Sequence, residues 1–369
     1  MAPLLTSIDE LPTAILSDIL SRVSGESLLP YRCVCKHWRE AIDDSYFSNP
    51  IHCSKERAVL FHEYDEEEIH LLKIHGEAAA QMIKIGKFPV PRGYAIQGSC
   101  NGLLFFRHRT DVKNNGELLI NPITKDFLRL PRAPDLPPDV SVYGLGFDRS
   151  TNMYKMVQIN ANGFDYRTRT CTLGARVYDF HKRSWRTCKA PPLPHSAGPS
   201  RNFVFASGAL NWFLKSYSLS DGPLARAMLS FDLIKEEFSL IPIPDVFFEC
   251  GDFNLGTRMH ELGGSLALVH RLGNRDIDLW VLQDSTRREW TRKYSMGLPW
   301  AVKGNYFTVV GAYKRDELIL RCDGDMYLYD VNEDRFTKCW TGARGCYAHF
   351  RCEPLSLVPL ERLGDAARL

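Results

Sequence analysis

The sequence predicts a multidomain protein of the α plus all-β class: a short N-terminal unit of three helices, followed by a β-propeller-like domain of about six blades. Three observations lead to this prediction. Apolar residues near the N-terminus recur at helical spacing, the rest of the chain reads as short strands, and one hairpin pattern recurs along it. A pair of β-sandwiches is the alternative for the β region. We expect four segments: the helices over residues 1–48, a linker with possible closing-blade strands over 49–92, the propeller over 93–355 and a C-terminal tail over 356–369.

The first segment carries more apolar helical surface than it can bury. On a helical wheel that starts at Ile15, Ile19 falls at about 40°, Leu16 at about 100° and Leu20 at about 140°. Further helical turns are expected over residues 27–32 and 34–42. Because this unit has only about 40 residues, a single core inside it is too small to cover the whole apolar stripe. The surplus surface indicates a binding site for another protein.

These residues also resemble a known family. The pairs Leu11-Pro12, Ile15-Leu16 and Ile19-Leu20, followed by the run from Arg32 to Arg39, are similar to an F-box. The resemblance implies that the helices bind the Skp-type adaptor of a cullin-based ubiquitin ligase. The adaptor-binding residues expected on this basis are Leu11, Pro12, Ile15, Leu16, Ile19, Leu20, Leu28, Val34 and Trp38. The alternative is that the helices merely cap the β domain.

Composition excludes several classes of function. The net charge is +2, which gives no strong field for nucleic acid, so we expect no nucleic-acid partner. No run of 18 apolar residues is present and the N-terminus lacks the pattern of a secretory signal, so we expect no membrane partner and a cytoplasmic or nuclear protein, or both. The 11 cysteines include no C-x-x-C pair and are interpreted as reduced, buried thiols. Cys33, Cys35 and His37 at i, i+2 and i+4 of a helix do not converge, so no metal site is expected.

A hairpin pattern recurs from residue 94 onward. An Asp or Asn follows an apolar run, and an aromatic residue comes six positions later, where the next strand begins. The pairs are Asn121/Phe127, Asp179/Trp185, Asp232/Phe238, Asp284/Trp290 and Asp330/Phe336, and their starts lie 58, 53, 52 and 46 residues apart. The Asp or Asn is expected to start the turn through its own side chain. This spacing is typical of a propeller blade or a kelch-like repeat.

Each repeat contains two earlier strands, which gives four strands in each blade. The segments left over at the two ends, residues 58–74 and 345–352, are expected to pair in one closing blade. Closure in this way would leave no exposed edge strand.

This region resembles a second family. The motifs lie, in order, at Ser99–Leu104, Asn121–Lys125, Leu130-Pro131, Tyr143–Asp148 and Tyr154–Val157. Together they are similar to the F-box-associated domain of plant F-box proteins. The resemblance implies a kelch-like propeller that serves as a receptor for a protein target.

The sequence contains none of the common catalytic motifs, and we expect neither a catalytic residue nor a cofactor. The function expected is that of a non-catalytic substrate-recognition subunit of a Skp-cullin-F-box ubiquitin ligase, bound through the adaptor to a cullin. The alternatives are a propeller scaffold that acts independently of ubiquitination, and a propeller enzyme or lectin. Candidate residues for contact with the unknown protein substrate are loop aromatics and arginines: Tyr166, Arg167, Arg169, Tyr217 and Trp300.

Overall fold

A computed structural model of the 369-residue chain provides the structure. It describes residues 11–20, 22–23, 28, 30–43, 57–63, 68–75, 81–110, 116–133, 141–165, 167, 170–193, 197–216, 226–248, 258–272, 276–284, 289–297, 307–314, 316–322, 324–341, 348–354, 356–364 and 367–368. The helices among these are α1 (Thr13–Leu20) and α3 (Lys36–Asp43), with the 3-10 turns η4 (Asp245–Phe248) and η5 (Leu360–Arg362). Leu28, Pro30 and Tyr31 are also helical, but the neighbouring part of that expected helix lies outside the described residues.

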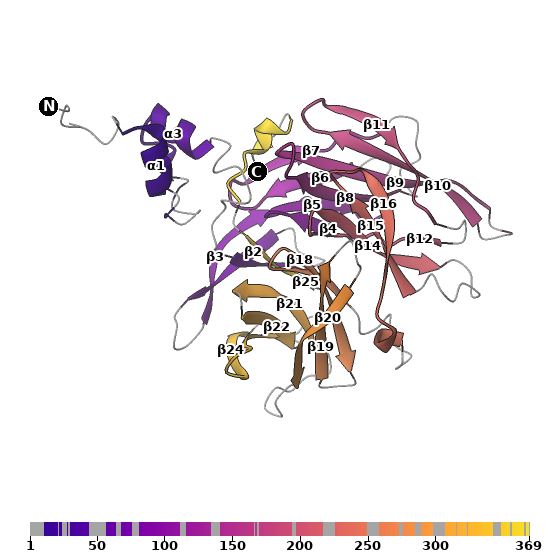
Figure 1. The fold of residues 1–369 in the computed structure, drawn as a ribbon. Helices are drawn as coiled ribbons and strands as arrows, with labels where there is room; N and C mark the ends of the chain where they lie inside the picture. The colour runs from indigo at the N-terminus through magenta and orange to yellow at the C-terminus, as the bar shows by residue number, and fades with distance from the viewer. Residues whose placement is uncertain are drawn as a thin grey trace.

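The β region is a β-propeller, and its strands form antiparallel sheets that fan around a common centre (Figure 1). The first two sheets along the chain have the orders β26-β7-β6-β5-β4 and β11-β10-β9-β8. Their strands are β4 (Tyr94–Cys100), β5 (Leu103–His108), β6 (Leu118–Asn121), β7 (Asp126–Arg129), β8 (Ser141–Asp148), β9 (Met153–Asp165), β10 (Thr170–Asp179), β11 (Ser184–Cys188) and β26 (Ala367–Arg368).

Three further sheets follow, with the orders β12-β14-β15-β16, β17-β18-β19-β20 and β21-β22-β23-β24, and β13 pairs with β14. Their strands are β12 (Ala197–Pro199), β13 (Val204–Ala206), β14 (Ala209–Ser216), β15 (Ala227–Asp232), β16 (Glu237–Pro242), β17 (Arg258–Leu262), β18 (Ser265–Leu272), β19 (Asp276–Asp284), β20 (Glu289–Gly297), β21 (Phe307–Lys314), β22 (Glu317–Cys322), β23 (Asp325–Asp330) and β24 (Arg335–Thr341). The first strands β13, β17 and β21 lie against one another in that order around the centre. The alternative of two β-sandwiches is therefore wrong.

The two ends of the β region pair with each other, as the leftover segments predicted. The sheet order is β25-β1-β2-β3, formed by β25 (Ala348–Pro354), β1 (Arg57–Glu63), β2 (Glu68–His75) and β3 (Gln81–Pro89). β25 runs antiparallel to β1 from the Arg57↔Pro354 pair to the Glu63↔Ala348 pair. The closing sheet therefore joins strands from opposite ends of the chain, and the possible closing-blade strands of residues 49–92 correspond to β1, β2 and β3.

The recurring hairpin has one geometry in four sheets. The Oδ1 atoms of Asn121, Asp179, Asp232 and Asp330 each accept a hydrogen bond from the backbone N–H two residues later, at 2.9 to 3.0 Å. The fourth residue after each of these Asn or Asp residues has a positive φ of 47 to 59°, and this left-handed conformation closes the turn of the hairpin. The aromatic residue six positions after the Asn or Asp pairs across the hairpin with the residue that precedes the Asn or Asp. Phe238 pairs in this way with Phe231, at 4.6 Å between ring centroids. The turn of Asp284 lies outside the described residues.

A fifth copy of this turn joins β8 to β9 and is absent from the sequence prediction. Asp148 Oδ1 accepts the N–H of Ser150 at 2.8 Å, Asn152 has a φ of 57°, and the ring of Tyr154 lies 5.0 Å from that of Phe147. The conformation of this turn therefore depends on residues within the turn, and it is the same whichever pair of strands the turn connects.

The connections divide the propeller into two faces. Antiparallel strands place alternate connections at opposite ends of a sheet. One end carries short turns, such as the two residues between β4 and β5, and the other carries long connections, such as the 15 residues between β16 and β17. We call these ends the turn face and the loop face. Contacts between neighbouring turns, such as Ser207 N–H to the Gly264 carbonyl at 2.7 Å, show that the short turns gather on one side.

The C-terminal residues, expected to form a tail, pack on the turn face instead. We call residues 356–364 the C-terminal segment. Its side chains Leu357, Val358, Leu360 and Leu363 are buried. The segment follows β25 across the turn between β4 and β5, where Gly102 has a φ of 81° and any side chain would collide with the Pro354 carbonyl. In Figure 1 it is the yellow stretch that lies between the helices and β7.

Candidate functional site

Helix α1 begins directly after a proline. The Pro12 carbonyl accepts hydrogen bonds from the N–H groups of Ile15 at 2.9 Å and Leu16 at 3.1 Å, which starts the first turn. Proline suits this position because the first N–H groups of a helix have no partner within the helix. The helix ends at Leu20, whose carbonyl accepts the Val23 N–H at 3.0 Å. The eight residues are thus held by local bonds at both ends.

The apolar stripe of α1 is divided into a covered half and an exposed half. Leu16 and Leu20, four residues apart, are 0% and 1% exposed. Ile15 and Ile19 are also four residues apart, and each lies about 100° around the helix from the leucine that follows it. Their side chains are 49% and 41% exposed. The surplus apolar surface that the sequence predicts is therefore present, but it involves half of the stripe.

A second exposed apolar group lies between the two helices. Val34 is 57% exposed and Tyr31 is 38% exposed. The N–H of Val34 donates to the Tyr31 carbonyl at 3.1 Å, and that of Cys33 donates to the Pro30 carbonyl at 3.0 Å, so these residues form a tight turn. The Tyr31 ring contacts the Trp38 ring edge-on at 5.8 Å. We call Pro12, Ile15, Ile19, Tyr31 and Val34 the exposed apolar set.

The other expected adaptor-binding residues lie elsewhere. Leu28 is buried together with Leu16 and Leu20, while Leu11 and Trp38 are half-buried. Trp38 packs against the same buried side chains. The sequence did not single out Tyr31, although its aromatic ring beside an expected helix end was a visible signal. Cys33 is exposed, which differs from the expectation that the cysteines are buried.

The covered half of α1 packs with α3, in a group of buried side chains that continues into the propeller. Leu16, Leu20 and Leu28 belong to one continuous group of buried side chains that also contains Ile123, in the turn between β6 and β7, and Leu357, in the C-terminal segment. Both of these partners lie on the turn face. The helices are thus attached at the turn face, with the loop face at the opposite end of the sheets.

The structure describes one of the five expected substrate-binding residues. Tyr166, Arg169, Tyr217 and Trp300 lie outside the described residues. Arg167 is exposed in the connection between β9 and β10, which belongs to the loop face.

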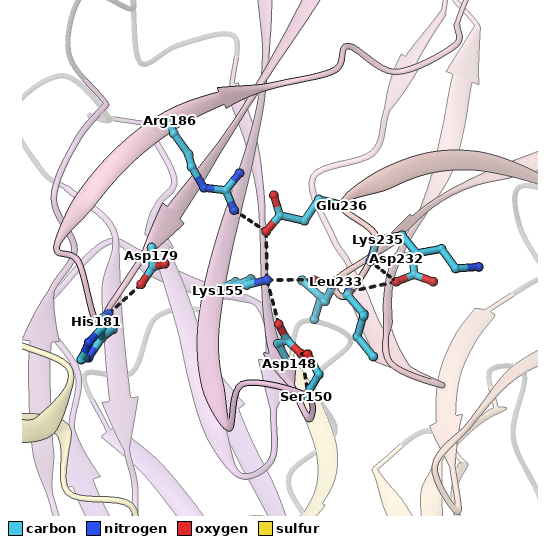
Figure 2. A network of polar contacts seen from close by, with 11 residues as sticks. Asp148, Ser150, Lys155, Asp179, His181, Arg186, Asp232, Leu233, Lys235 and Glu236 are labelled. Atoms are coloured by element: carbon cyan, nitrogen blue, oxygen red, sulfur yellow. Dashed lines mark hydrogen bonds and ion pairs between the residues drawn. The ribbon is translucent and has the colours of Figure 1, made fainter.

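A buried network of ionic contacts joins two neighbouring sheets on the turn face (Figure 2). Lys155 Nζ lies 2.8 Å from Asp148 Oδ2 and 2.9 Å from Glu236 Oε1, and it donates to the Leu233 carbonyl at 2.9 Å. Arg186 also contacts the Glu236 carboxylate. Burial by itself would raise the pKa of Asp148 and of Glu236, but hydrogen bonds from Lys155, Ser150 and Arg186 outweigh it and hold both pKa values below their usual range. Such permanently charged carboxylates hold sheets together and do not transfer protons at neutral pH.

A second buried group of polar side chains lies near the loop face. Arg107 Nε lies 3.5 Å from Glu117 Oε1, and Gln158 Nε2 donates to Tyr143 Oη at 3.1 Å. Burial raises the pKa of Glu117, and the nearby Arg107 only partly offsets this. Because Arg107 also donates to the Ser141 carbonyl, the pair ties β5 to the start of β8. The described parts of the chain contain no set of three side chains that could bind a metal ion. None of the described helices is long and apolar enough to cross a bilayer.

Comparison with known proteins agrees with the two-part architecture. A family model described as F-box-like matches residues 8–52, and one described as F-box associated beta propeller domain matches residues 55–351. F-box protein At3g07870 of Arabidopsis thaliana is 28% identical, over 84% of this chain and 78% of its own length. F-box/kelch-repeat protein At3g23880 of the same plant is 25% identical, over 88% of this chain and 89% of its own.

The boundary between the two family models falls at residues 52–55, immediately before β1 starts at Arg57. The helices and the propeller therefore correspond to two separate family models. By the match over residues 55–351, this chain belongs to the family of proteins with an F-box associated β-propeller domain.

Proposed function

We propose that the protein is the substrate-recognition subunit of a Skp-cullin-F-box ubiquitin ligase, with the exposed apolar set as its adaptor site. One observation carries the proposal: Ile15 and Ile19 remain 49% and 41% exposed although Leu16 and Leu20 beside them are buried. Burying each such side chain in a partner contributes roughly 1.5–3 kcal/mol. The match of residues 8–52 to an F-box-like family supports a Skp-type adaptor as that partner.

The proposal divides the expected adaptor residues into two roles. Leu11, Pro12, Ile15, Ile19 and Val34 contact the adaptor. Leu16, Leu20, Leu28 and Trp38 hold the helices together, because they are buried or half-buried in the group that also contains Ala41 and Ile42 of α3. Tyr31 joins the contacting residues because it is exposed beside Val34.

The β region supplies the receptor in this proposal. In this proposal each of the six sheets is one blade, and the pairing of β25 with β1 closes the ring. The helices occupy the turn face, so the loop face is left to receive a protein target. Long connections that vary in chemistry are typical of recognition surfaces on rigid scaffolds. The complex would act by holding its target near a ubiquitin-charged enzyme, which raises the effective concentration of the two reactants.

Calorimetric titration with a purified Skp-type adaptor tests the adaptor site. The variant Ile15→Asp with Ile19→Asp should lose binding by at least about a hundredfold, because two charges would be buried in the interface. The matched control is Thr13→Asp with Asp18→Asn, which changes exposed positions of the same helix and should bind as the wild type does. Wild-type affinity in the Ile15 and Ile19 variant would overturn the assignment of the site.

A scaffold that acts independently of ubiquitination is the second candidate. It is favoured by the buried group that Leu16, Leu20 and Leu28 share with Ile123 and Leu357, since a module that only caps the propeller would share its core with it. The two candidates differ in one readout. A scaffold would show no heat of binding with the adaptor, whereas a ligase subunit would form a one-to-one complex.

A further inference from the structure

The C-terminal segment takes part in two different groups of buried side chains. Leu357 belongs to the group that contains Leu16 and Leu20 of α1. Three other apolar side chains of the segment belong to a second group, which contains side chains of the β4–β7 sheet. These are Val358, Leu360 and Leu363. The segment therefore lies between the helices and the propeller core, where Figure 1 shows it as the yellow stretch.

Hydrogen bonds that do not involve the helices fasten this segment to the propeller. Asn121 Nδ2 donates to the Ser356 carbonyl at 3.1 Å and to the Val358 carbonyl at 2.9 Å. Ser356 Oγ accepts the Val358 N–H at 3.3 Å. Pro359 comes next, with a φ of −70°. Because the proline ring fixes φ, the chain leaves Val358 along a restricted path.

The two ends of the segment are held as well. Before it, β25 pairs with β1 as far as Pro354, and after it β26 pairs with β7. At Gly364 an added Cβ would come within 2.9 Å of the Leu128 side chain, so the chain passes closely over β7. The segment is therefore a fixed part of the turn face, and Leu357 has a fixed place on it.

The helices are joined to this surface in a different way. Polar side chains of the helices have partners within residues 11–43, since Arg22 pairs with Asp18 at 2.8 Å and His37 Nε2 lies 3.2 Å from the Leu11 carbonyl oxygen. The group that the helices share with the propeller is apolar, and apolar contacts have no preferred direction. Two parts of one chain move relative to each other unless a large apolar interface holds them. The orientation of the helices therefore depends on the shape of the apolar surface that they share.

We infer that Leu357 is a positioning residue: the C-terminal segment presents it as a fixed apolar contact that sets the orientation of the adaptor-binding helices relative to the propeller. The inference rests on the proposed function, because orientation matters when one chain must hold an adaptor at its helices and a target at its propeller. A link of defined geometry between two binding sites raises the effective concentration of the bound partners above that of a loose link. Leu357 contacts neither partner and acts through the helices.

Pulsed electron paramagnetic resonance on the full-length chain tests this inference. Spin labels are carried by unnatural amino acids at Glu40 of α3 and at Lys182 in the turn between β10 and β11, because both side chains are exposed. We expect a narrow distribution of label-to-label distances in the otherwise unchanged chain. Leu357→Ser should widen this distribution by about twofold or more, since the helices lose a fixed contact. A distribution that is broad before the substitution, or one that Leu357→Ser leaves unchanged, would overturn the inference.

Leu363→Ser is the matched control. Leu363 is 8% exposed, as Leu357 is, and it lies in the same segment but belongs to the propeller group. Leu363→Ser should lower the stability of the protein and leave the distance distribution narrow. Equal widening in the two variants would mean general loosening of the segment and would overturn the positioning role. If a serine variant does not fold, Leu357→Ala and Leu363→Ala replace the pair, with a smaller widening expected for Leu357→Ala alone.

Adaptor binding separates this inference from the proposed function. Calorimetric titration with a purified Skp-type adaptor should give Leu357→Ser an affinity within about threefold of the wild type, because the exposed apolar set is unchanged. A larger loss would overturn the positioning role, since Leu357 would then support the adaptor site itself. A wild-type chain that does not bind the adaptor would overturn the proposed function, whereas the distance distributions of the free chain would still decide the role of Leu357.

Discussion

The side-chain amide of Asn121 donates a hydrogen bond of 2.9 Å to the main-chain carbonyl of Val358, which lies 237 residues later in the chain. Asn121 is completely buried, and its Oδ1 atom at the same time accepts the N–H of Ile123 that shapes the turn between β6 and β7. One side chain therefore builds a propeller turn and anchors the C-terminal segment to it. Because Leu357 of that segment belongs to the same group of buried side chains as Leu16 and Leu20 of α1, the turn also supports the surface to which the helices are attached.

The first prediction concerns this anchor. Replacing Asn121 by Ala leaves two buried carbonyls, those of Ser356 and Val358, without their side-chain donor. Loss of such bonds typically costs about 1–3 kcal/mol of the free energy of unfolding. Chemical denaturation measures it. Asn332→Ala is the control, since Asn332 is exposed in the equivalent turn between β23 and β24 and should change stability by less than about 0.5 kcal/mol. Equal stability of the two variants would show that the anchor is dispensable.

The second prediction concerns the packing of the C-terminal segment. Leu360 is 0% exposed, whereas Glu361 next to it is exposed. Leu360→Ala should destabilise the protein by about 2–5 kcal/mol, because it leaves a cavity between the segment and the β4–β7 sheet. Glu361→Ala should have almost no effect. Denaturation curves compare the two, and similar curves would mean that residues 356–364 behave as the free tail that the sequence suggested.

The third prediction concerns the buried lysine that joins two sheets. Lys155→Met removes the cation beside Asp148 and one of the two cations beside Glu236, so the buried Asp148 carboxylate loses its counter-charge and Glu236 keeps only Arg186. Breaking a buried pair from one side costs roughly 3–5 kcal/mol. The exposed ion pair of Arg22 with Asp18 is the comparison, and Arg22→Met should cost less than about 1 kcal/mol. A loss as small at Lys155 as at Arg22 would refute the structural role of the network.

The fourth prediction is a pH dependence that follows from the same network. The pKa of Glu236 lies below its usual value, because hydrogen bonds from Arg186 and Lys155 outweigh the effect of burial. A carboxylate of this kind stabilises the fold above its unfolded-state pKa of about 4 and loses that effect as the pH falls through its folded-state pKa. The free-energy difference between wild type and Glu236→Gln should therefore be largest near pH 7 and shrink below about pH 5.

The neighbouring Glu237→Gln variant controls for a general loss of negative charge, since Glu237 is exposed. Its difference from the wild type should stay small across the same pH range. Acid titration of both variants, followed by urea denaturation at each pH, gives the comparison. A Glu236→Gln difference that grows on acidification would contradict the sign of the pKa shift.

Local features of the fold could be predicted from the sequence, because they depend on residues close together in the chain. The side chain of Asp232, which accepts the Ile234 N–H, and the aromatic Phe238 six residues later specify their hairpin through local contacts alone. The copy of this turn at Asp148 has the same chemistry, but it joins the first two strands of its sheet, so the spacing of the last hairpins does not reveal it. The apolar stripe of α1 was also predictable, since it depends on helical spacing alone.

Features that depend on distant contacts could not be predicted. The sequence does not tell which half of the stripe is covered, because Leu16 and Leu20 are buried with Ile123 and Leu357. The packing of the C-terminal segment depends on Asn121, more than two hundred residues earlier.

The central claim is that the exposed half of α1 is covered by an adaptor while the propeller's loop face stays open. Amide hydrogen exchange of the full-length chain, alone and with one equivalent of a purified Skp-type adaptor, tests it most directly. We expect slower exchange in α1 and at residues 31–34 on addition of the adaptor, with unchanged exchange at the loop-face ends of β5 and β7. Unchanged exchange in α1, or protection at the loop-face ends instead, would contradict it.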